Sequence, residues 1–323
     1  MKRVVLIGGG TGMSTVARYL KYYDVKLSLI VTITDDGGSS GILRQIMAIP
    51  PPGDVRNNLV ALAEDEGMLR RLFSFRFSSE GIQRHSLGNL IIAGLSEMLG
   101  SFPEAVTAAS RLLRTRGEVF PVSGEEVHLV AQLDDGTTVQ GETAVTLLGP
   151  KIRRVFLDRD VQPLPEVLEC LDNADIILVG PGSLYTSVIS NFLVKGVSES
   201  FCNTTAEVAY ISNIMTQPGE TDGFGLKKHV DTLENYTKRP FDKVFWADAS
   251  NIDKNVLKEY ASKGALPVQN DAPYDQKIER IDQLSVEYTY DKEYKYVIRH
   301  SEESIMQISE YLGIAYEKNN KFR

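Results

Sequence analysis

The chain contains 323 residues, of which 42% are hydrophobic and 24% are charged, a composition typical of a folded globular protein. Its 43 acidic and 35 basic residues give a net charge of −8, which argues against a general nucleic-acid-binding surface. No apolar run reaches the roughly 18 residues that suggest a transmembrane helix, and the apolar run after Met1 is too short for a signal peptide. We therefore expect a cytoplasmic protein without a membrane span, which holds any anionic ligand by a local positive site.

The N-terminal third has a strand, a helix and a second strand. The apolar run at 4–7 predicts a strand that is buried on both faces, and apolar spacing predicts a helix over 14–22. A second buried strand is predicted at 27–34, so this segment forms a βαβ unit with a right-handed crossover. Helical spacing continues in four further segments, at 57–63, 68–75, 89–99 and 102–113.

The pattern changes near residue 117. Residues 127–141 alternate between apolar and polar, and Asp134-Asp135-Gly136 is typical of a hairpin turn, which predicts antiparallel strands. The α/β pattern then returns, with strands predicted at 176–179, 208–212, 244–246 and 288–299 and a final helix at 302–312. The sequence thus predicts a single α/β domain over 1–323. Its fold is a doubly wound, mainly parallel sheet with a β-rich antiparallel insertion at 117–156.

The first candidate site is the glycine-rich turn after the first strand. Glycines let the backbone approach a phosphate closely, and the following helix offers unpaired amide groups and the positive end of its dipole. The strict dinucleotide fingerprint is not met, because Met13 or Thr15 stands where its last glycine would be. The sequence alone is compatible with a phosphate-binding turn and with a tight turn that binds no ligand. The candidate ligand-binding residues are Gly9, Gly10, Thr11 and Gly12.

Two adjacent acidic residues follow the second strand. They stand where a ribose-binding carboxylate lies in dinucleotide-binding folds. They could equally position Mg²⁺ beside a phosphate, because hard cations take oxygen ligands, or the segment could be a helix start that a serine caps. The candidates are Asp35, Asp36, Gly37, Gly38, Ser39 and Ser40, with Asp35 and Asp36 as the metal ligands if Mg²⁺ is used.

Two further polar segments precede predicted helices. In the first, Asp54 can cap the next helix, and Arg56, next to Asn57, can bind an anionic oxygen through two parallel hydrogen bonds. A solvated surface is the alternative for this segment. In the second, His85 can serve as an acid, a base or a phosphate donor, with Asn89 nearby, although a structural role is also open for a lone histidine.

A glycine-containing turn also follows the predicted strand at 176–179. Its successive amides can form an anion-binding nest, with hydroxyl groups as further donors, and the loop after the next strand is polar as well. Because open α/β sheets bind ligands at the carboxyl ends of their strands, we expect all these segments to line one ligand site. The candidates here are Gly180, Gly182, Ser183, Thr186, Asn213, Thr216, Gln217 and Glu220.

P-loop and HExxH motifs are absent from the sequence, and neither cysteine stands in a nucleophile motif. No catalytic residue is therefore predicted, and whether the protein is an enzyme is left open.

Six segments, in this order, resemble the gluconeogenesis factor family (YvcK type) of the CofD-like superfamily. They are GGGTG at 8–12, DDGGSSG at 35–41, PPGDVRN at 51–57, HSLGN at 85–89, GPGSLYTS at 180–187 and MTQPGET at 215–221. The resemblance implies a Rossmann-like fold in a cytoplasmic bacterial protein. It also implies a role in carbon metabolism and in cell-shape and envelope morphogenesis during growth on gluconeogenic carbon sources.

The resemblance implies a ligand as well. Members of this type are thought to bind UDP-sugars, notably UDP-N-acetylglucosamine, without an established reaction, so the expected partner is a nucleotide sugar and not a nucleic acid. Tyr260 and Arg299 resemble the family's late tyrosine and arginine that contact the ligand; a core aromatic and a surface charge are the alternatives. We further expect a homo-oligomer, and the sequence indicates no protein partner.

The other branch of the superfamily is an enzyme, a 2-phospho-L-lactate transferase that moves a phospholactyl-type group onto a deazaflavin with Mg²⁺. Our leading interpretation is a nucleotide-sugar-binding regulator without catalysis. The alternative is a Mg²⁺-dependent transferase in which Asp35 and Asp36 hold the metal and the glycine turns hold the leaving diphosphate. A dinucleotide-dependent enzyme is the third interpretation, and the missing last glycine disfavours it.

Overall fold

The protein is described from a computed structural model, which covers residues 1–64, 67–78, 85–147, 152–288 and 295–317. Its centre is a seven-stranded sheet with the strand order β10-β9-β8-β7-β1-β2-β3, and every neighbouring pair is parallel. This arrangement confirms the predicted Rossmann-like, mainly parallel α/β fold. The strands are β1 (Lys2–Gly8), β2 (Val25–Val31), β3 (Glu118–Pro121), β7 (Ile176–Val179), β8 (Glu207–Ile211), β9 (Lys243–Ala247) and β10 (Ile278–Ile281).

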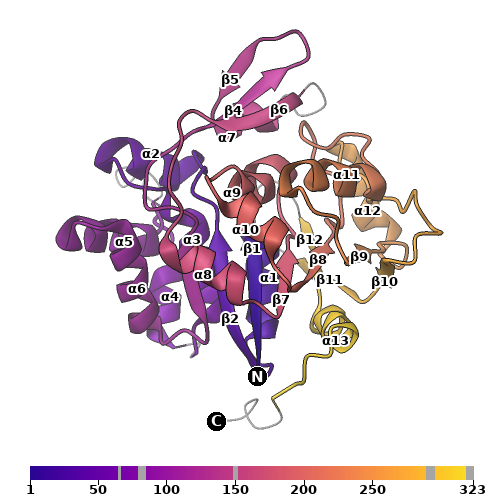
Figure 1. Ribbon diagram of the computed structural model, residues 1–323, viewed down its shortest axis with the longest axis horizontal. Coiled ribbons are helices and arrows are strands. Elements are labelled where there is room, and N and C mark those ends of the chain that lie inside the picture. Colours follow the sequence, from indigo (N-terminus) through magenta and orange to yellow (C-terminus); the bar gives the residue numbers. More distant parts are fainter. Residues whose placement is uncertain (65–66, 79–84, 148–151, 289–294, 318–323) are drawn as a thin grey trace.

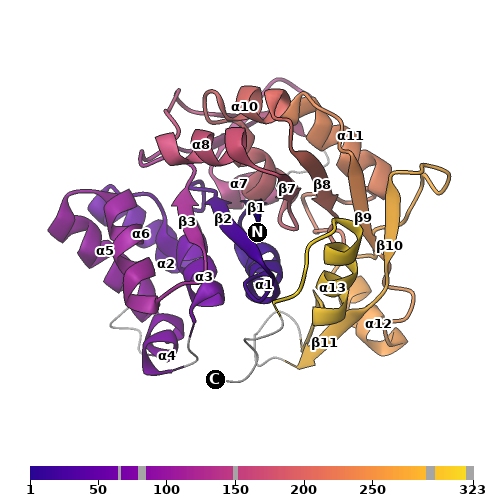
Figure 2. The same cartoon turned by 60° about the horizontal axis from the view of Figure 1, so that its bottom comes forward.

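Helices cover both faces of the sheet, which is why its strands are apolar on both sides. Val4 and Leu6 of β1 pack into one hydrophobic core, whereas Val5 and Ile7 pack into the core on the opposite face. Figure 2 shows α1 and α13 on one side of the sheet and α8, α10 and α11 on the other. The first core includes residues of α1 (Gly10–Leu20), α2 (Gly38–Met47), α3 (Pro52–Leu62), α4 (Met68–Ser74), α5 (Leu87–Leu99), α6 (Phe102–Leu113) and α13 (Glu302–Tyr311). The second includes residues of α7 (Glu142–Thr146), α8 (Pro165–Asn173), the π-helix η3 (Leu184–Ile189), α9 (Ser190–Phe192), α10 (Val197–Asn203) and α11 (Leu226–Thr237).

The predicted insertion forms a separate antiparallel sheet, with the order β5-β4-β6. Its strands are β4 (Leu129–Leu133), β5 (Thr138–Gln140) and β6 (Ile152–Leu157). Figure 1 shows it beyond the carboxyl end of β1, together with α7. The antiparallel part is shorter than the predicted 117–156, because β3 at its start pairs in parallel with β2 at the edge of the central sheet. A four-residue strand carries too little pattern to specify its partner.

The C-terminal strands also differ from the prediction. The sequence suggested one strand over 288–299, but β11 (Leu284–Tyr288) and β12 (Tyr296–His300) form an antiparallel pair of their own. Residues 289–294 of the predicted strand lie outside the described residues. The short edge strand β10 was not predicted, because its sequence IERI has no sustained apolar run. None of the helices in the described ranges is long and apolar enough to cross a membrane.

The strand order reverses direction between β1 and β7. From β1 the chain continues outward to β2 and β3, and from β7 it continues outward to β8, β9 and β10. Such a reversal is a topological switch point, and ligands of open α/β sheets bind in the crevice outside the carboxyl ends of the strands there. The fold therefore places the turns after β1 and β7 next to each other at this position.

Candidate functional site

Two glycine-rich turns meet at the switch point. A Cβ atom built on Gly12 would lie 3.0 Å from the carbonyl oxygen of Pro181, and one built on Gly182 would lie 3.2 Å from that of Gly9. Larger residues would have to move the facing backbone, so the glycines allow this close approach. The two turns, which the sequence separates by about 170 residues, therefore form one continuous surface.

This surface lines a cleft of about 250 Å³. Tyr260 of α12 (Lys254–Ser262) and Arg299 of β12 line the same cleft. The Tyr260 hydroxyl accepts a hydrogen bond of 3.1 Å from the Ile298 amide, and the Arg299 Nε donates to Glu287 Oε2 at 3.1 Å. Seven of the predicted ligand-binding residues line the cleft: Thr11, Gly12, Gly182, Ser183, Asn213, Tyr260 and Arg299.

The polar loop after β8 holds the Gly182–Ser183 turn in place. The Ser183 Oγ donates to Gln217 Oε1 at 2.7 Å, and the Asn213 Nδ2 donates to the Gly182 carbonyl at 2.9 Å. Glu220 accepts a 2.6 Å hydrogen bond from the Tyr185 amide. Three further residues that the sequence predicted as ligand-binding, Gln217, Glu220 and Thr216, form hydrogen bonds within the protein here. The Thr216 hydroxyl accepts from the Leu266 amide at 2.9 Å.

Acidic side chains lie beside the first glycine turn. A Cβ on Gly9 would stand 2.5 Å from Asp54 Oδ2, and the Asp54 carboxylate accepts a hydrogen bond from the Gly10 amide. A Cβ on Gly53 would stand 3.0 Å from Asp35 Oδ2. The segment at 51–57 therefore meets the turn at 8–12, and the segment at 35–41 meets the segment at 51–57.

Burial and mutual repulsion raise the pKa values of the acids in this site. Burial, with the charge of Asp35 nearby, raises the pKa of Asp54 to about 7. Burial also raises the pKa of Asp35, and it raises the pKa of Glu142 well above its usual range, with the charges of Asp35 and Asp54 as further causes. Burial raises the pKa of Glu220 to about 7. Near neutral pH the site is consequently less negative than its composition suggests.

Asp35 and Asp36 use different partners, although they are adjacent. Asp35 Oδ1 accepts from the Gly37 amide at 2.8 Å, whereas Asp36 Oδ1 accepts from the amide and the hydroxyl of Thr143 at 3.0 Å and 2.8 Å. Asp36 therefore connects the insertion to the site. Carboxylate oxygens beside a phosphate-type turn are ligands that Mg²⁺ accepts, together with water. Within the described residues, however, no group of three or more His, Cys, Asp or Glu side chains could hold a metal ion.

A buried polar group joins three of the predicted segments. The Ser39 hydroxyl lies 2.9 Å from His85 Nδ1 and accepts a 3.1 Å hydrogen bond from Asn89 Nδ2. Arg56 is buried next to this group, because a Cβ built on Gly88 would lie 2.8 Å from the Arg56 Cδ. The Arg56 Nη2 donates a hydrogen bond to Asn57 Oδ1 at 2.7 Å. Burial lowers the pKa of Arg56 to about 10, which still leaves the guanidinium charged at neutral pH.

The remaining candidates shape turns around these groups. Gly38 and Gly180 have φ values of +45° and +78°, in the left-handed region that favours glycine. The Ser40 hydroxyl forms a hydrogen bond to Asp35, and the Thr186 carbonyl accepts a 3.1 Å hydrogen bond from Thr34 Oγ1. The predicted segments thus surround the ends of β1, β2 and β7 rather than lying on unrelated faces.

Sequence reasoning missed two residues of this region. Ser187 follows the predicted nest and stands next to both turns, because a Cβ on Gly9 or on Gly182 would lie 3.3 Å from its own Cβ. Glu142 comes from α7 in the insertion and interacts with Asp35 and Asp54. Ser187 belongs to the quoted GPGSLYTS segment, so its place in that motif was a usable signal. Glu142 follows no strand end of the central sheet, so no pattern indicated it.

The comparison with known protein families agrees with this geometry. A family model described as 2-phospho-L-lactate transferase CofD matches residues 4–290, which includes every turn described above. The chain belongs to the CofD family. This CofD-family chain is 45% identical over 269 residues to the gluconeogenesis factor of Halalkalibacterium halodurans, covering 83% of the chain and 84% of that protein. It is 39% identical over 311 residues to the gluconeogenesis factor of Bacillus subtilis, covering 95% and 96% respectively.

A solved structure shares the whole fold of this CofD-family protein. A crystal structure of a UPF0052 family member from Bacillus halodurans matches with a TM-score of 0.87 and 40% sequence identity. The match covers 96% of this chain and 98% of that one. The insertion and the C-terminal strands are therefore part of the shared architecture.

Proposed function

We propose that the protein is a nucleotide-sugar-binding regulator of carbon metabolism that also acts in cell-shape and envelope morphogenesis, with a UDP-sugar such as UDP-N-acetylglucosamine as its ligand. The relatives named gluconeogenesis factor support the metabolic part. The remaining support comes from the cleft, where the Gly12 and Gly182 turns meet Tyr260 and Arg299.

The chemistry of the cleft suits a nucleotide diphosphate. The backbone amides and small side chains of the two turns suit phosphate oxygens, and Arg299 adds the positive charge that the net charge of −8 does not supply. Tyr260 offers an aromatic ring for stacking or for apolar contact with a base or a sugar. With about 250 Å³, the cleft is smaller than most drug-sized ligand pockets, so a nucleotide sugar would extend along the strand ends toward Ser39 and Asp35.

Thermal denaturation with a panel of ligands tests this proposal. UDP-N-acetylglucosamine should raise the Tm in a concentration-dependent manner, because a ligand that binds only the folded state stabilises it by mass action. N-acetylglucosamine alone should have little effect, because it lacks the diphosphate that the turns would hold. If no UDP-sugar at millimolar concentration shifts the Tm, this ligand class is excluded.

A transferase function is the second candidate, and the family model described as 2-phospho-L-lactate transferase favours it. Asp35 and Asp36 would hold Mg²⁺ beside the phosphate, and the cation, when bound, would neutralise the charge of the leaving nucleoside monophosphate. Incubation of the protein with Mg²⁺, a deazaflavin acceptor and a phospholactyl-nucleotide donor tests it. Formation of the phospholactyl-deazaflavin product supports the transferase, and absence of the product under these conditions counts against it.

A further inference from the structure

A second cavity, of about 640 Å³, lies outside the switch-point cleft. Strand β6 of the insertion, η3 and α11 contribute to its lining, and no residue is shared with the cleft described above. We call this cavity the basic pocket, because its lining includes Arg153, Arg154, Lys228 and Lys238, with Tyr185 and Tyr236 as its two tyrosines.

All charged residues that line the basic pocket are cations. This is unusual in a chain with 43 acidic and 35 basic residues. The acidic residues on and after α11 have partners elsewhere: Asp231 pairs with Lys227 at 2.6 Å, and Glu234 accepts from the Phe241 amide at 3.0 Å. The local field inside the pocket is therefore positive, and it favours an anion.

The pocket cations have only neutral partners within the described parts of the chain. Arg154 Nε donates to Gln132 Oε1 at 3.0 Å, and Lys238 Nζ donates to the Asn235 carbonyl. Lys228 lies over the Phe224 ring, with its Nζ 5.5 Å from the ring centroid. No ion pair to a carboxylate neutralises these side chains in the described residues. Their charge is consequently available to a ligand.

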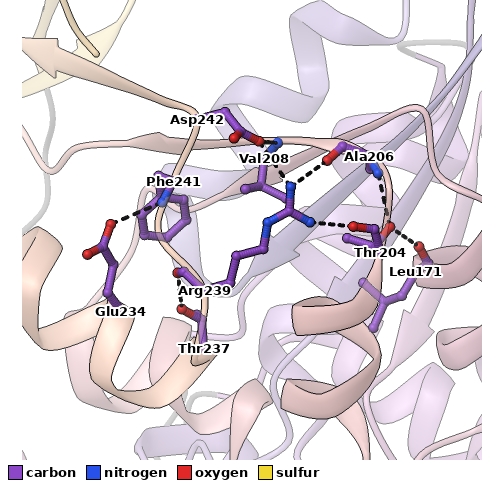
Figure 3. Close-up of polar contacts among 9 residues, drawn as sticks. All are labelled: Leu171, Thr204, Ala206, Val208, Glu234, Thr237, Arg239, Phe241 and Asp242. Atoms are coloured by element: carbon purple, nitrogen blue, oxygen red, sulfur yellow. Dashed lines mark hydrogen bonds and ion pairs between the residues drawn. The ribbon is translucent and has the colours of Figure 1, made fainter. Parts of the chain in front are cut away.

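The wall that α11 contributes is fixed by hydrogen bonds. The Tyr236 hydroxyl accepts from the Val155 amide at 2.8 Å, and Ser198 Oγ donates to the Tyr236 carbonyl at 2.6 Å. Figure 3 shows the region just after α11, where Arg239 donates to the carbonyl oxygens of Thr204 at 2.5 Å and Ala206 at 3.1 Å. These contacts lie within the chain and hold the wall in place, so little ordering of the wall is required when a ligand binds.

Tyr185 connects the basic pocket to the first site. Its side chain lines the pocket, whereas its backbone amide donates to Glu220 Oε1, in the loop that holds the Gly182–Ser183 turn. Both cavities therefore share one short segment, 183–187. Tyr185 lies two residues after Ser183, between the pocket and the glycine turn.

We infer that the basic pocket binds a small phosphorylated metabolite that carries at least two negative charges. Its volume lies within the range of small-molecule sites, and its cations, tyrosine hydroxyls and aromatic faces suit phosphate groups on a compact organic body. This inference does not depend on the nucleotide-sugar proposal, because the two cavities use different residues.

Calorimetric titration with inorganic pyrophosphate at low ionic strength tests the inference. The wild-type protein should bind pyrophosphate, and the double variant Arg153→Ala/Lys228→Ala should bind it at least 10-fold more weakly. The control double variant Lys254→Ala/Lys258→Ala removes the same charge from α12, away from the pocket, and should bind like the wild type. Affinity should fall as the salt concentration rises, because salt screens the ion pairs.

Other outcomes overturn the inference. Equal weakening in both double variants would show a net-charge effect, and loss only in Arg299→Ala would place pyrophosphate in the switch-point cleft. No binding of pyrophosphate at millimolar concentration, together with binding of an acidic peptide, would point to a protein partner instead. If the alanine variant does not fold, Arg153→Gln/Lys228→Gln keeps the side-chain volume and serves the same comparison.

Discussion

The Asp54 Oδ2 atom lies 2.5 Å from the point at which a Cβ of Gly9 would stand. The first glycine turn therefore packs directly against the start of α3, and the Gly10 amide donates to the same carboxylate. Gly9 itself has extended backbone dihedrals, with φ −174°, so the space around it rather than its conformation requires a glycine. This contact joins the two segments that carry most of the polar groups of the candidate site.

Substitution Gly9→Ala should lower the free energy of unfolding by about 1–3 kcal/mol, the usual cost of overpacking. The new methyl group would meet Asp54 and the Thr32 side chain, which are held by hydrogen bonds to the Gly10 amide and to Ser190 respectively. Urea denaturation measures the change. The control is Gly94→Ala in α5, where a Cβ meets nothing within 4 Å and where alanine favours the helix. Equal stability of Gly9→Ala and the wild type would contradict the packing described here.

The raised pKa of Asp54 predicts a specific pH dependence of stability. Its pKa is about 7 in the folded state, against 3.8 for the free side chain, so between about pH 4 and pH 7 the folded state binds more protons than the unfolded state. Stability must then decrease as pH rises through this window, and the loss is complete above pH 7.

Substitution Asp54→Asn removes this contribution, so the variant should gain stability relative to the wild type as pH rises from 4 to 8. Because Asp54 is still partly exposed, we expect a relative gain of about 1–3 kcal/mol rather than the full value of the pKa shift. Denaturation midpoints at pH 4, 6 and 8 measure it. A difference that is constant with pH, or that grows toward acid, would show that the Asp54 carboxyl has an ordinary pKa.

Two hydrogen bonds from Thr143 to Asp36 hold α7 of the insertion against the segment after β2. We expect local opening of α7 to become easier when one of them is removed. Substitution Thr143→Val removes the 2.8 Å hydroxyl contact but keeps the amide contact at 3.0 Å. A loss of about 1 kcal/mol corresponds to roughly fivefold faster local amide exchange in α7. Hydrogen exchange measures this change. Thr107→Val, which removes an exposed hydroxyl–carbonyl contact in α6, should leave exchange in α7 unchanged.

The parallel core was predictable because its strands are short apolar runs that end in glycine or polar residues. The run at 4–7 lies inside β1, and the predicted strand at 176–179 coincides with β7. The helix predicted at 102–113 likewise has the bounds of α6. In each case local composition alone defines the element, since burial on both faces or on one helical face leaves a strong periodic signal.

The sequence did not specify the contacts that depend on distant segments. The edge strand β3 has four residues, and only its pairing with β2 separates it from the insertion. Glu142 reaches the acids after β2 through the fold of the insertion, which no local pattern encodes. The same holds for the polar loop after β8: Gln217 and Glu220 were predicted as ligand contacts, and the structure shows partners for them in the 183–187 segment.

The most direct test of the proposed function is the calorimetric affinity of UDP-N-acetylglucosamine for the wild type and for Arg299→Ala. We expect at least a 10-fold loss of affinity in Arg299→Ala with a Tm close to that of the wild type, because Arg299 lines the cleft and pairs with Glu287 near the surface. The control Arg280→Ala removes another ion-paired arginine, which contacts Asp248 outside the cleft, and should retain the wild-type affinity. Equal affinity of the wild type and Arg299→Ala, or no binding by the wild type, would contradict the account.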